Sequence, residues 1–278
     1  MSQAESIFVS TRTRTTENFP VGSWLVAPAH RPAVHAFYRF ARAADDVADD
    51  PALDAEAKVA RLEAFDHALA DGGEGPDEAL ALRAVLAGRG LTNDHPRQLL
   101  QAFLADARGR PCRTWSDLIA YCRFSAAPVG RFLLDLHGED RALWPASDAL
   151  CTALQIENHL QDAAGDWLDL RRLYIPKTWL DEASLSERDL LAPALTPALR
   201  AVYDRVLERV DGLNAQARPL ARGIRDRRLR MEAAAIVDIS HRLARKLRRR
   251  DPLAARVEPG PLEKVLALAR GILAGIAP

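Results

Sequence analysis

Two acidic segments, far apart in the chain, hold the residues whose types and spacing could do chemistry. The first contains Asp45 and Asp49, and the second contains Asp162 and Asp166, with Asn158 four residues before Asp162. On a helix, residues four apart lie on one face, so each pair would present its carboxylates one turn apart. Carboxylate and amide oxygens are hard ligands that suit Mg²⁺, and Mg²⁺ in turn binds phosphate oxygens. Two such helices facing each other would form an oxygen-rich metal site.

The alternative is that both acidic segments are solvated helix ends. Aspartate is a poor helix former, and two carboxylates four residues apart repel each other, so each pair needs a compensating partner. Both pairs lie in otherwise apolar helical patterns. Because a core-facing aspartate is rarely tolerated without a partner, the repeated pattern favours a metal site over two solvated ends.

The segments that position these acids are predicted to be helices in an all-α fold. Ala, Leu and Arg dominate the chain, and the alternation of β-branched residues that is typical of strands is missing. The expected helices cover 33–50, 55–70, 78–88, 96–108, 115–126, 131–136, 149–168, 184–191, 197–224, 229–250 and 261–276.

Prolines and capping residues set several of these boundaries. Pro32 suits the first turn of the helix with the first acidic pair, and Pro51 ends that helix. Thr114 and Ser147 are expected to be N-caps, Ser147 for the helix with the second pair. Gly130 is expected to break a helix, either as a packing kink or as an opening that leaves room for a ligand.

Composition limits the class of protein. The chain has 278 residues, 48% of them hydrophobic and 27% charged, with 38 Lys and Arg balancing 38 Asp and Glu. These values are ordinary for a globular protein, and the zero net charge gives no reason to expect a nucleic-acid partner. No run of 18 apolar residues predicts a membrane span, and the polar N-terminus does not resemble a secretory signal.

Cysteine, histidine and linker patterns add further limits. Cys112, Cys122 and Cys151 are widely separated, as expected for reduced cytosolic thiols, and the histidines show no zinc-site spacing. We expect residues 1–17 to be disordered. No linker rich in Ser, Gly or Pro divides the rest, so residues 18–278 are predicted to form a single domain.

Arginines near the acids are candidate phosphate ligands. Arg42 precedes the first pair by one turn, and Arg171 and Arg172 follow the second pair directly. A guanidinium at these positions could reach the phosphates that the metal holds. Residues 213–250 are also rich in arginine; a solvated helix face is one explanation, and contact with diphosphate or an anionic membrane is the other.

Aromatic residues allow two interpretations as well. Tyr121 and Tyr174 are either hydrogen-bonding core residues or groups that take part in proton transfer. Phe19 and Phe37 are most simply core residues. In a helical cavity such rings could also stabilise a carbocation by about 0.5–2 kcal/mol each.

Four sequence blocks in this order resemble the squalene/phytoene synthase family. They are Asn18 to Ser23, Phe37 to Asp49, Tyr121 to Gly130, and Asn158 to Asp166 followed by Arg172 to Pro176. Together they extend from about residue 15 to about residue 180. The first and third blocks are most similar to the bacterial hopanoid-pathway branch that makes hydroxysqualene. The resemblance implies a class I isoprenoid synthase fold, all-α and single-domain, with a central cavity between the two aspartate helices.

The resemblance also implies roles for individual residues. The expected ligands of Mg²⁺, with Mn²⁺ as the alternative metal, are Asp45, Asp49, Asn158, Asp162 and Asp166. Residues expected to contact diphosphate are Arg42, either Arg171 or Arg172, and Tyr174. Tyr121 would assist proton or cation chemistry, and the residues expected to line the prenyl cavity are Phe19, Phe37, Val129 and Gly130.

The implied reaction is the magnesium-dependent loss of diphosphate from presqualene diphosphate, with water capturing the resulting cation, so no NADPH is expected. One alternative is condensation of two prenyl diphosphates, for example farnesyl diphosphate, to presqualene diphosphate, squalene or phytoene. Another is a non-catalytic scaffold relative, although the four aspartates Asp45, Asp49, Asp162 and Asp166 argue against it. The expected location is the cytoplasm, with peripheral contact to the inner face of the membrane. The sequence does not predict an oligomeric state.

Overall fold

The computed structural model describes residues 26–70 and 73–276, and these residues form helices without any strand. The N-terminal half contains α1 (Arg31–Asp49), α2 (Ala55–Leu69), α3 (Asp77–Ala87), α4 (Asp94–Ala107), α5 (Trp115–Ser125) and α6 (Ala127–Leu136). The remainder contains η1 (Arg141–Leu143), α7 (Trp144–Leu170), α8 (Lys177–Glu182), η2 (Glu187–Leu191), α9 (Pro197–Ala217), α10 (Leu220–Gly223), α11 (Arg227–Arg249) and α12 (Pro261–Ile276). The all-α prediction is confirmed.

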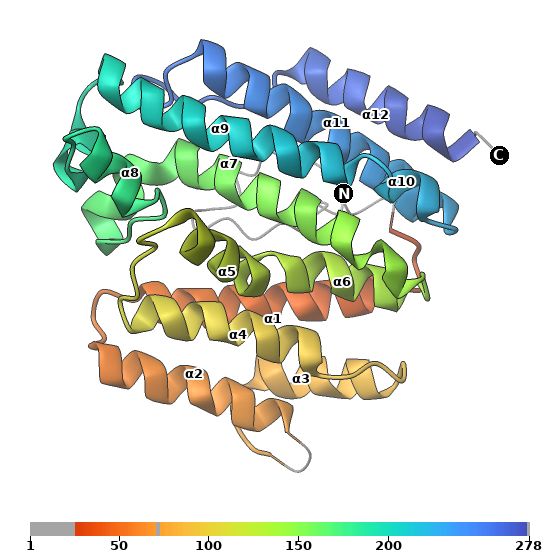
Figure 1. The fold of residues 1–278 in the computed structure, drawn as a ribbon. Coiled ribbons are helices and arrows are strands. Elements are labelled where there is room, and N and C mark those ends of the chain that lie inside the picture. The colour runs from red at the N-terminus through yellow and green to blue at the C-terminus, as the bar shows by residue number, and fades with distance from the viewer. Residues whose placement is uncertain (1–25, 71–72, 277–278) are drawn as a thin grey trace.

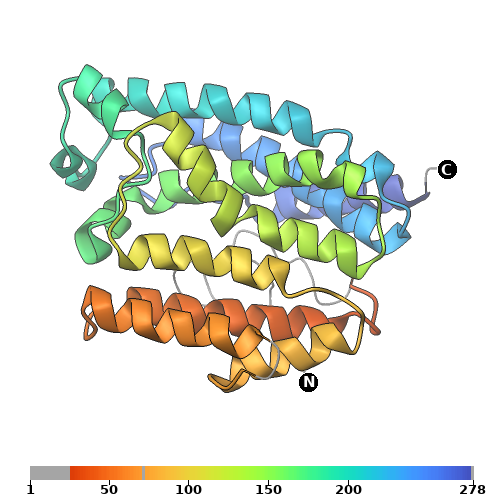
Figure 2. The same ribbon diagram turned by 60° about the horizontal axis from the view of Figure 1, so that its bottom comes forward.

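The 27-residue helix α7 runs through the middle of the molecule (Figure 1). Helix α9 packs on one side of α7, and α5 and α6 pack on the other. Helices α1 to α4 contact one another in a layer beyond α5 and α6, as Figure 2 shows from a second direction. At the opposite end, α11 packs on α9 and carries α12 on its outer side. None of the described helices is long and apolar enough to cross a bilayer.

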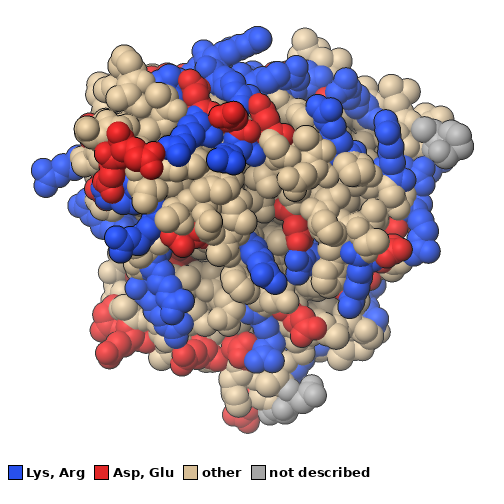
Figure 3. All heavy atoms as spheres, in the orientation of Figure 1, with Lys and Arg blue, Asp and Glu red and all other residues tan. Residues whose placement is uncertain are grey.

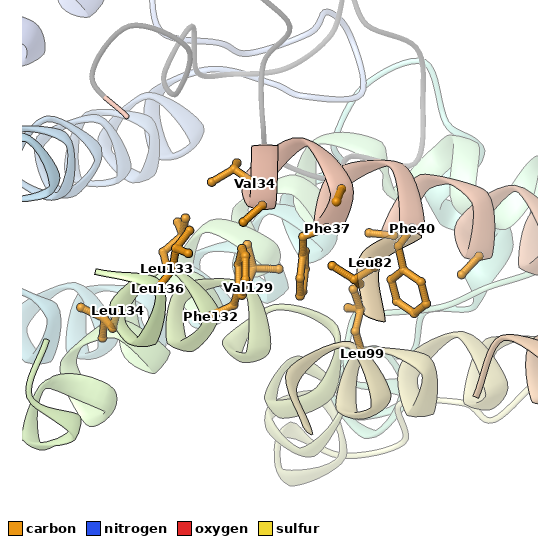
Figure 4. Close-up of a cluster of buried hydrophobic side chains, with 14 of the residues drawn as sticks. Val34, Phe37, Phe40, Leu82, Leu99, Val129, Phe132, Leu133, Leu134 and Leu136 are labelled. Carbon is orange, nitrogen blue, oxygen red and sulfur yellow. The ribbon is translucent and has the colours of Figure 1, made fainter. Parts of the chain in front are cut away.

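Aromatic and aliphatic side chains join the N-terminal layer to the centre. Phe37 of α1 stacks on Phe132 of α6 with ring centroids 4.3 Å apart (Figure 4). Phe40 meets Phe65 of α2 edge-on, with ring centroids 5.8 Å apart. Phe40 is fully buried. Such ring pairs contribute beyond the apolar area they bury, so they hold α1 in a fixed rotation about its axis.

Several predicted boundaries are confirmed. Helix α1 ends at Asp49, just before Pro51, and α12 covers 261–276 as expected. Thr114 caps α5: its side chain accepts a hydrogen bond from the Asp117 backbone, and the Asp117 carboxylate accepts one from the Thr114 backbone. This reciprocal pair satisfies two donors at the helix start.

The predicted helix break at Gly130 is wrong, and so is the predicted cap at Ser147. The break falls at Ala126, where the backbone leaves the helical region (φ −126°, ψ −47°), and α6 begins at Ala127. A helix continuing through Pro128 would clash with the carbonyl four residues earlier, so the break must precede Pro128. Helix α7 starts at Trp144 with Pro145 in its first turn, which places Ser147 inside the helix, where it is buried.

Two other predicted segments are also corrected. The helix predicted over 197–224 is two helices, because α9 ends at Ala217 and Pro219 precedes the short α10. Within the segment 184–191, only Glu187–Leu191 is helical, as the 3₁₀ helix η2, and the prediction missed α8 before it. Residues 1–17 lie outside the described ranges, and the single domain over 18–278 stays a prediction.

Candidate active site

Helix α1 turns one of its acids into the protein and the next one outward. Asp45 shares the buried face of α1 with Ala41, Ala44 and Ala48, and only 2% of its surface is exposed. The neighbouring Asp46 has 58% of its side chain exposed and forms an ion pair with Arg42 at 2.6 Å. Arg42 also lies 3.4 Å from Asp45, so this arginine contacts the first acidic segment from its own helix.

The second acidic segment meets Asp45 in one polar pocket. Asn158, Asp162 and Asp166 lie at helical spacing on α7 and line this pocket together with Asp45 of α1. The pocket spans about 500 Å³ of space, part of which is open to solvent. Its other lining residues are Phe103, Asp106, Tyr121, Ser125, Gln155 and His159. The two acidic segments, remote in the sequence, therefore face a common space.

Arg172 links the end of α7 to the end of α1. Its guanidinium donates to Asp49 at 2.5 Å and to the backbone carbonyl of Ala48 at 2.9 Å. Arg171 ends α7 in the left-handed conformation (φ 55°), and its exposed guanidinium lies 5.6 Å from the centre of the Trp167 ring. Of the two candidate arginines, Arg172 lies at the acidic cluster and Arg171 lies outside it.

A fourth carboxylate of the pocket, Asp106, which the sequence did not single out, anchors Tyr121 of the pocket wall and the neighbouring Tyr174. Tyr121 donates to one carboxylate oxygen of Asp106 at 2.8 Å, and Tyr174 donates to the other at 3.0 Å. Burial raises the pKa of Asp106 to about 6, although Arg172 and the two hydroxyl donors oppose the rise. Burial also raises the pKa of both tyrosines well above 10, so both hydroxyls keep their protons. Asp106 therefore fixes the positions of two protonated tyrosine hydroxyl groups, and we call these three residues the Asp106 cluster.

His159 occupies the pocket between these tyrosines and the second acidic segment. Its ring stacks on Tyr174 with centroids 3.8 Å apart, and Nε2 lies 3.2 Å from the Gln155 side-chain amide nitrogen. Its Nδ1 lies 3.9 Å from Asp166. If Gln155 donates to Nε2, the ring proton is on Nδ1 and faces the Asp166 carboxylate.

Glu157, two residues before His159, points to the opposite side of α7. Its carboxyl is fully buried and accepts a hydrogen bond from Ser240 of α11 at 2.9 Å. Ser240 also lies 2.8 Å from the Asn214 side-chain oxygen on α9. Burial raises the pKa of Glu157 well above its ordinary value, with Ser240 and Asn214 opposing the rise. Glu157 thus belongs to a polar contact among three helices and not to the pocket.

The charges of the pocket explain why it would accept a cation. Burial raises the pKa of Asp45 to about 8, and the nearby Asp49 adds to the rise while Arg42 and Arg172 oppose it. Burial likewise raises the pKa of Asp49 and of Asp162. Carboxylates that resist ionisation in a buried pocket gain most from an added positive charge.

The donor atoms of the pocket fit Mg²⁺ chemically. Asp45 of α1 and Asn158, Asp162 and Asp166 of α7 supply oxygen ligands to one space. Asp49 does not line this pocket, and its carboxylate is held by Arg172. Arg256 forms an ion pair with Asp162 at 3.1 Å, as Arg172 does with Asp49. Within the described ranges, no three His, Cys, Asp or Glu side chains are already close enough together to bind a metal.

A second, apolar cavity lies along an earlier stretch of the same helix. It spans about 440 Å³ of space, part of which is open to solvent. On α7 its wall is formed by Ser147, Leu150, Cys151 and Leu154, directly before the first polar-pocket residue, Gln155. The opposite walls come from α6, α10 and α11: Gly130, Leu133, Leu134, Leu220, Ile224, Leu229, Glu232, Ala233 and Ile236.

The predicted prenyl-cavity residues divide into three groups. Gly130 lines the apolar cavity, where a Cβ atom would lie 2.3 Å from the Ser147 hydroxyl oxygen. Phe37 and Val129 lie in the neighbouring hydrophobic core and do not line the cavity (Figure 4). Phe19 lies outside the described residues.

Glu232 is a second residue that the sequence did not single out. It lies on the cavity-facing side of α11 with Leu229, Ala233 and Ile236, and only 3% of its surface is exposed. Burial alone raises its pKa to about 7. In the sequence, Glu232 is notable only as an acid on an otherwise apolar helical face. The sequence does not show that this face lines a cavity.

The comparisons with known proteins agree with this geometry. A hydroxysqualene synthase of Rhodopseudomonas palustris is 44% identical over 93% of this chain and 88% of its own length. Another, from Sinorhizobium fredii, is 40% identical over 90% of this chain and 86% of its own. The crystal structure of squalene synthase HpnC from Alicyclobacillus acidocaldarius superposes with a TM-score of 0.71 at 32% identity, covering 82% of this chain and 86% of that one. The family model for squalene/phytoene synthase matches residues 12–263. The chain belongs to the squalene/phytoene synthase family.

Proposed function

We propose that the protein is a hydroxysqualene synthase, which removes diphosphate from presqualene diphosphate and adds water to the remaining cation. The observation that carries this proposal is the arrangement along α7, where consecutive stretches of one helix line an apolar cavity and an acidic pocket. A prenyl diphosphate has the same two parts, a highly charged head and long apolar tails. The similarity to two hydroxysqualene synthases over about nine-tenths of the chain supports this particular reaction within the family.

The acids of α1 and α7 would hold the head of the substrate through a metal. We propose that Asp45, Asp49, Asn158, Asp162 and Asp166 bind Mg²⁺, which when bound supplies a Lewis acid for the departing diphosphate. The carboxylates then remain ionised, because the positive charge offsets the cost of their burial. Arg172 pairs with Asp49 and Arg256 pairs with Asp162, and both guanidinium groups would then contact phosphate oxygens.

Arg172 and the Asp106 cluster would bind and orient the head. We propose that Arg172 turns its guanidinium from Asp49 to a phosphate oxygen, with Arg42 assisting from α1. Tyr121 and Tyr174 keep their protons, so their role is to present hydroxyl groups and aromatic rings at the reacting end of the pocket. The rings of Phe103, Tyr121 and His159 form its remaining aromatic wall and can face a developing carbocation.

The apolar cavity would take at least part of the prenyl tails. Its aliphatic walls exclude water from the chain carbons, and the close contact of Gly130 with α7 shapes the wall on the α6 side. In the reaction the C–O bond to diphosphate breaks and the electron pair leaves with the diphosphate. Water then forms the new C–O bond, and its proton passes to the released diphosphate or to solvent.

Product analysis tests the proposal. Purified protein given presqualene diphosphate and Mg²⁺, without NADPH, should form hydroxysqualene and release diphosphate in equal amounts. Consumption of farnesyl diphosphate with accumulation of presqualene diphosphate would instead assign the protein to the condensation step. Incubation in ¹⁸O-labelled water should place the label in the alcohol, since the oxygen comes from water and not from the diphosphate ester.

We also propose that the protein works in the cytoplasm and collects its substrate at the membrane. Presqualene diphosphate and its product are long-chain lipids, which reside in the bilayer. The contact with the membrane would be peripheral.

A further inference from the structure

Helix α12 presents an apolar face to the outside of the molecule. Leu262, Leu273 and Ile276 each expose 62–70% of their surface, and Val265, Leu266 and Ile272 lie on the same face. These six residues account for most of the large hydrophobic side chains that are exposed in the described part of the chain. Their spacing of three, four and seven residues makes one continuous stripe along the helix. We call these six residues the α12 stripe.

The rest of α12 is firmly held, so the stripe is fixed in its outward direction. Ala267, Gly271 and Gly275 form the inner face, and a Cβ on Gly271 would lie 2.4 Å from the Met231 carbonyl oxygen of α11. Of the three charged residues of α12, Glu263 pairs with Lys246, Arg270 pairs with Asp238, and Lys264 is half-buried. None of the three belongs to the α12 stripe.

The surroundings of α12 are strongly basic. Residues 217–276 contain 15 Lys and Arg but only 6 Asp and Glu, in a chain whose totals are 38 and 38. Lys and Arg side chains are numerous over the part of the surface formed by α11 and α12 (Figure 3). An open groove beside α12 spans about 1340 Å³, including space open to solvent. Its lining residues are Arg218, His241, Arg245, Arg248, Arg270, Asp211, Asp238, Ala234 and Val237.

The acids do not neutralise this groove. Asp211 pairs with Arg248, and Asp238 pairs with Arg242 and Arg270. Arg218 and Arg245 have no carboxylate partner among the described residues. Two guanidinium groups thus remain available to anions beside an exposed apolar stripe.

We propose that the α12 stripe and the basic groove together dock the protein on the surface of an anionic phospholipid bilayer. The stripe would enter the boundary between headgroups and acyl chains, with the helix lying in the membrane plane, and the arginines would contact lipid phosphates. This inference rests on the proposed function, because an enzyme that takes a lipid from the bilayer and returns another must approach it.

Charge complementarity favours a bilayer over a second copy of the chain. A two-fold dimer through α12 would place the same surface of both copies in contact, with their basic grooves close together. Like charges across an interface oppose association. An anionic lipid surface instead supplies the opposite charge to the groove and an apolar layer to the stripe.

Vesicle co-sedimentation of the full chain tests the proposal. Wild-type protein should bind vesicles of mixed phosphatidylcholine and phosphatidylglycerol about ten-fold more tightly than vesicles of phosphatidylcholine alone. The double variant Leu262→Glu/Leu273→Glu should lose about ten-fold or more of that binding, since it places two carboxylates in the apolar layer. Leu191→Glu, which changes an exposed leucine of η2, is the matched control and should bind as wild type does. Arg218→Gln/Arg245→Gln should reduce the preference for anionic lipid.

Two outcomes overturn this inference. One is wild-type binding by Leu262→Glu/Leu273→Glu, and the other is a wild-type protein that ignores anionic vesicles but is a dimer that this variant dissociates. Turnover of presqualene diphosphate in detergent micelles separates the inference from the proposed function. The double variant should match wild type in micelles and lose turnover only on vesicles. If wild-type protein forms no hydroxysqualene in micelles, the proposed reaction fails whatever the vesicles show.

Discussion

Asp45 and Asp46 are neighbours on α1 with opposite surroundings, which makes them a matched pair for testing the acidic pocket. Asp45 is buried in the pocket, whereas the Asp46 side chain is mostly exposed. Asp45→Asn should lower kcat/KM by about 10²–10³-fold, because it removes charge where the diphosphate leaves. Asp46→Asn should stay close to wild type. Both are measured as diphosphate release, and near-normal activity in Asp45→Asn would count against the metal site.

The two arginines after α7 form a second matched pair. Arg172→Ala removes the guanidinium beside Asp49 and should lower kcat/KM by about 10–100-fold, the range for losing a charged hydrogen bond. Arg171→Ala removes an exposed group over Trp167 and should leave kcat/KM nearly unchanged. Equal losses in the two variants would show that Arg171 also reaches the substrate.

The raised pKa of buried Glu232 predicts that the stability of the protein depends on pH. Its pKa is raised from 4.5 to about 7 in the folded protein, so folding favours the protonated form. The contribution of Glu232 to the free energy of unfolding is therefore largest below about pH 4.5. It falls by about 3 kcal/mol as the pH rises from there through the folded-state pKa of about 7. Glu232→Gln should unfold at higher denaturant concentration than wild type at pH 8, and the difference should shrink towards pH 5. A difference independent of pH would exclude this explanation.

The paired acids were predictable at the residue scale, whereas Asp106 and Glu232 were not. Asp45, Asp49, Asp162 and Asp166 repeat one spacing, and repetition is visible in a sequence. Asp106 on α4 has no second acid one turn away, and its tyrosine partners come from α5 and from the segment after α7. Such a cluster exists only after three remote segments have packed together.

Gly130 determines how closely α6 approaches α7. Gly130→Ala would bring its Cβ to 2.3 Å from the Ser147 oxygen and 2.7 Å from the Cys151 sulfur, so the helices must separate. We expect a loss of about 1–3 kcal/mol in the free energy of unfolding. Gly212→Ala on the exposed face of α9 meets nothing within 4 Å and should stabilise the protein by about 0.5–1 kcal/mol. Denaturant unfolding of both variants measures the contrast.

Helix ends were predictable where a residue acts locally. Thr114 and Pro51 exert their effect within one turn, and both boundaries were found. Two wrong boundaries lie near prolines. The helix break expected at Gly130 falls at Ala126, ahead of Pro128, and Pro219 divides the helix expected over 197–224. In each case the proline ring interrupts the helical turn that precedes it. A glycine or a long apolar pattern does not reveal this effect.

Ligand binding should stabilise the whole molecule if α1 and α7 share a metal–diphosphate site. With Mg²⁺ and pyrophosphate present at about 100 times their dissociation constant, the free energy of unfolding should rise by about 2.7 kcal/mol. For a chain of this size that corresponds to a rise in Tm of roughly 5–10 °C. Scanning fluorimetry measures it, and Asp45→Asn should remove the shift. A wild-type Tm that does not respond to the pair of ligands would contradict the shared site.

The arrangement of whole helices came from the family resemblance and not from the pattern of residues. Amphipathic spacing predicts which face of each helix is buried, but it does not say which helix covers that face. The α12 stripe illustrates the limit, because its spacing is that of a buried face while the structure leaves it exposed. Only the packing of Gly271 and Gly275 against α11 shows which side of α12 is already used.

Helix α7 is a single unbroken helix that lines both the acidic pocket and the apolar cavity, and this has a consequence for how such chains can diverge. One residue inserted between Leu154 and Asn158 would rotate the carboxylates by about 100° around the axis, away from Asp45. Helical register therefore fixes the acidic pocket relative to the cavity. Under the proposed function, the bulk of side chains such as Ser147 and Leu150 could change to accept longer or shorter tails while the acids stay in place.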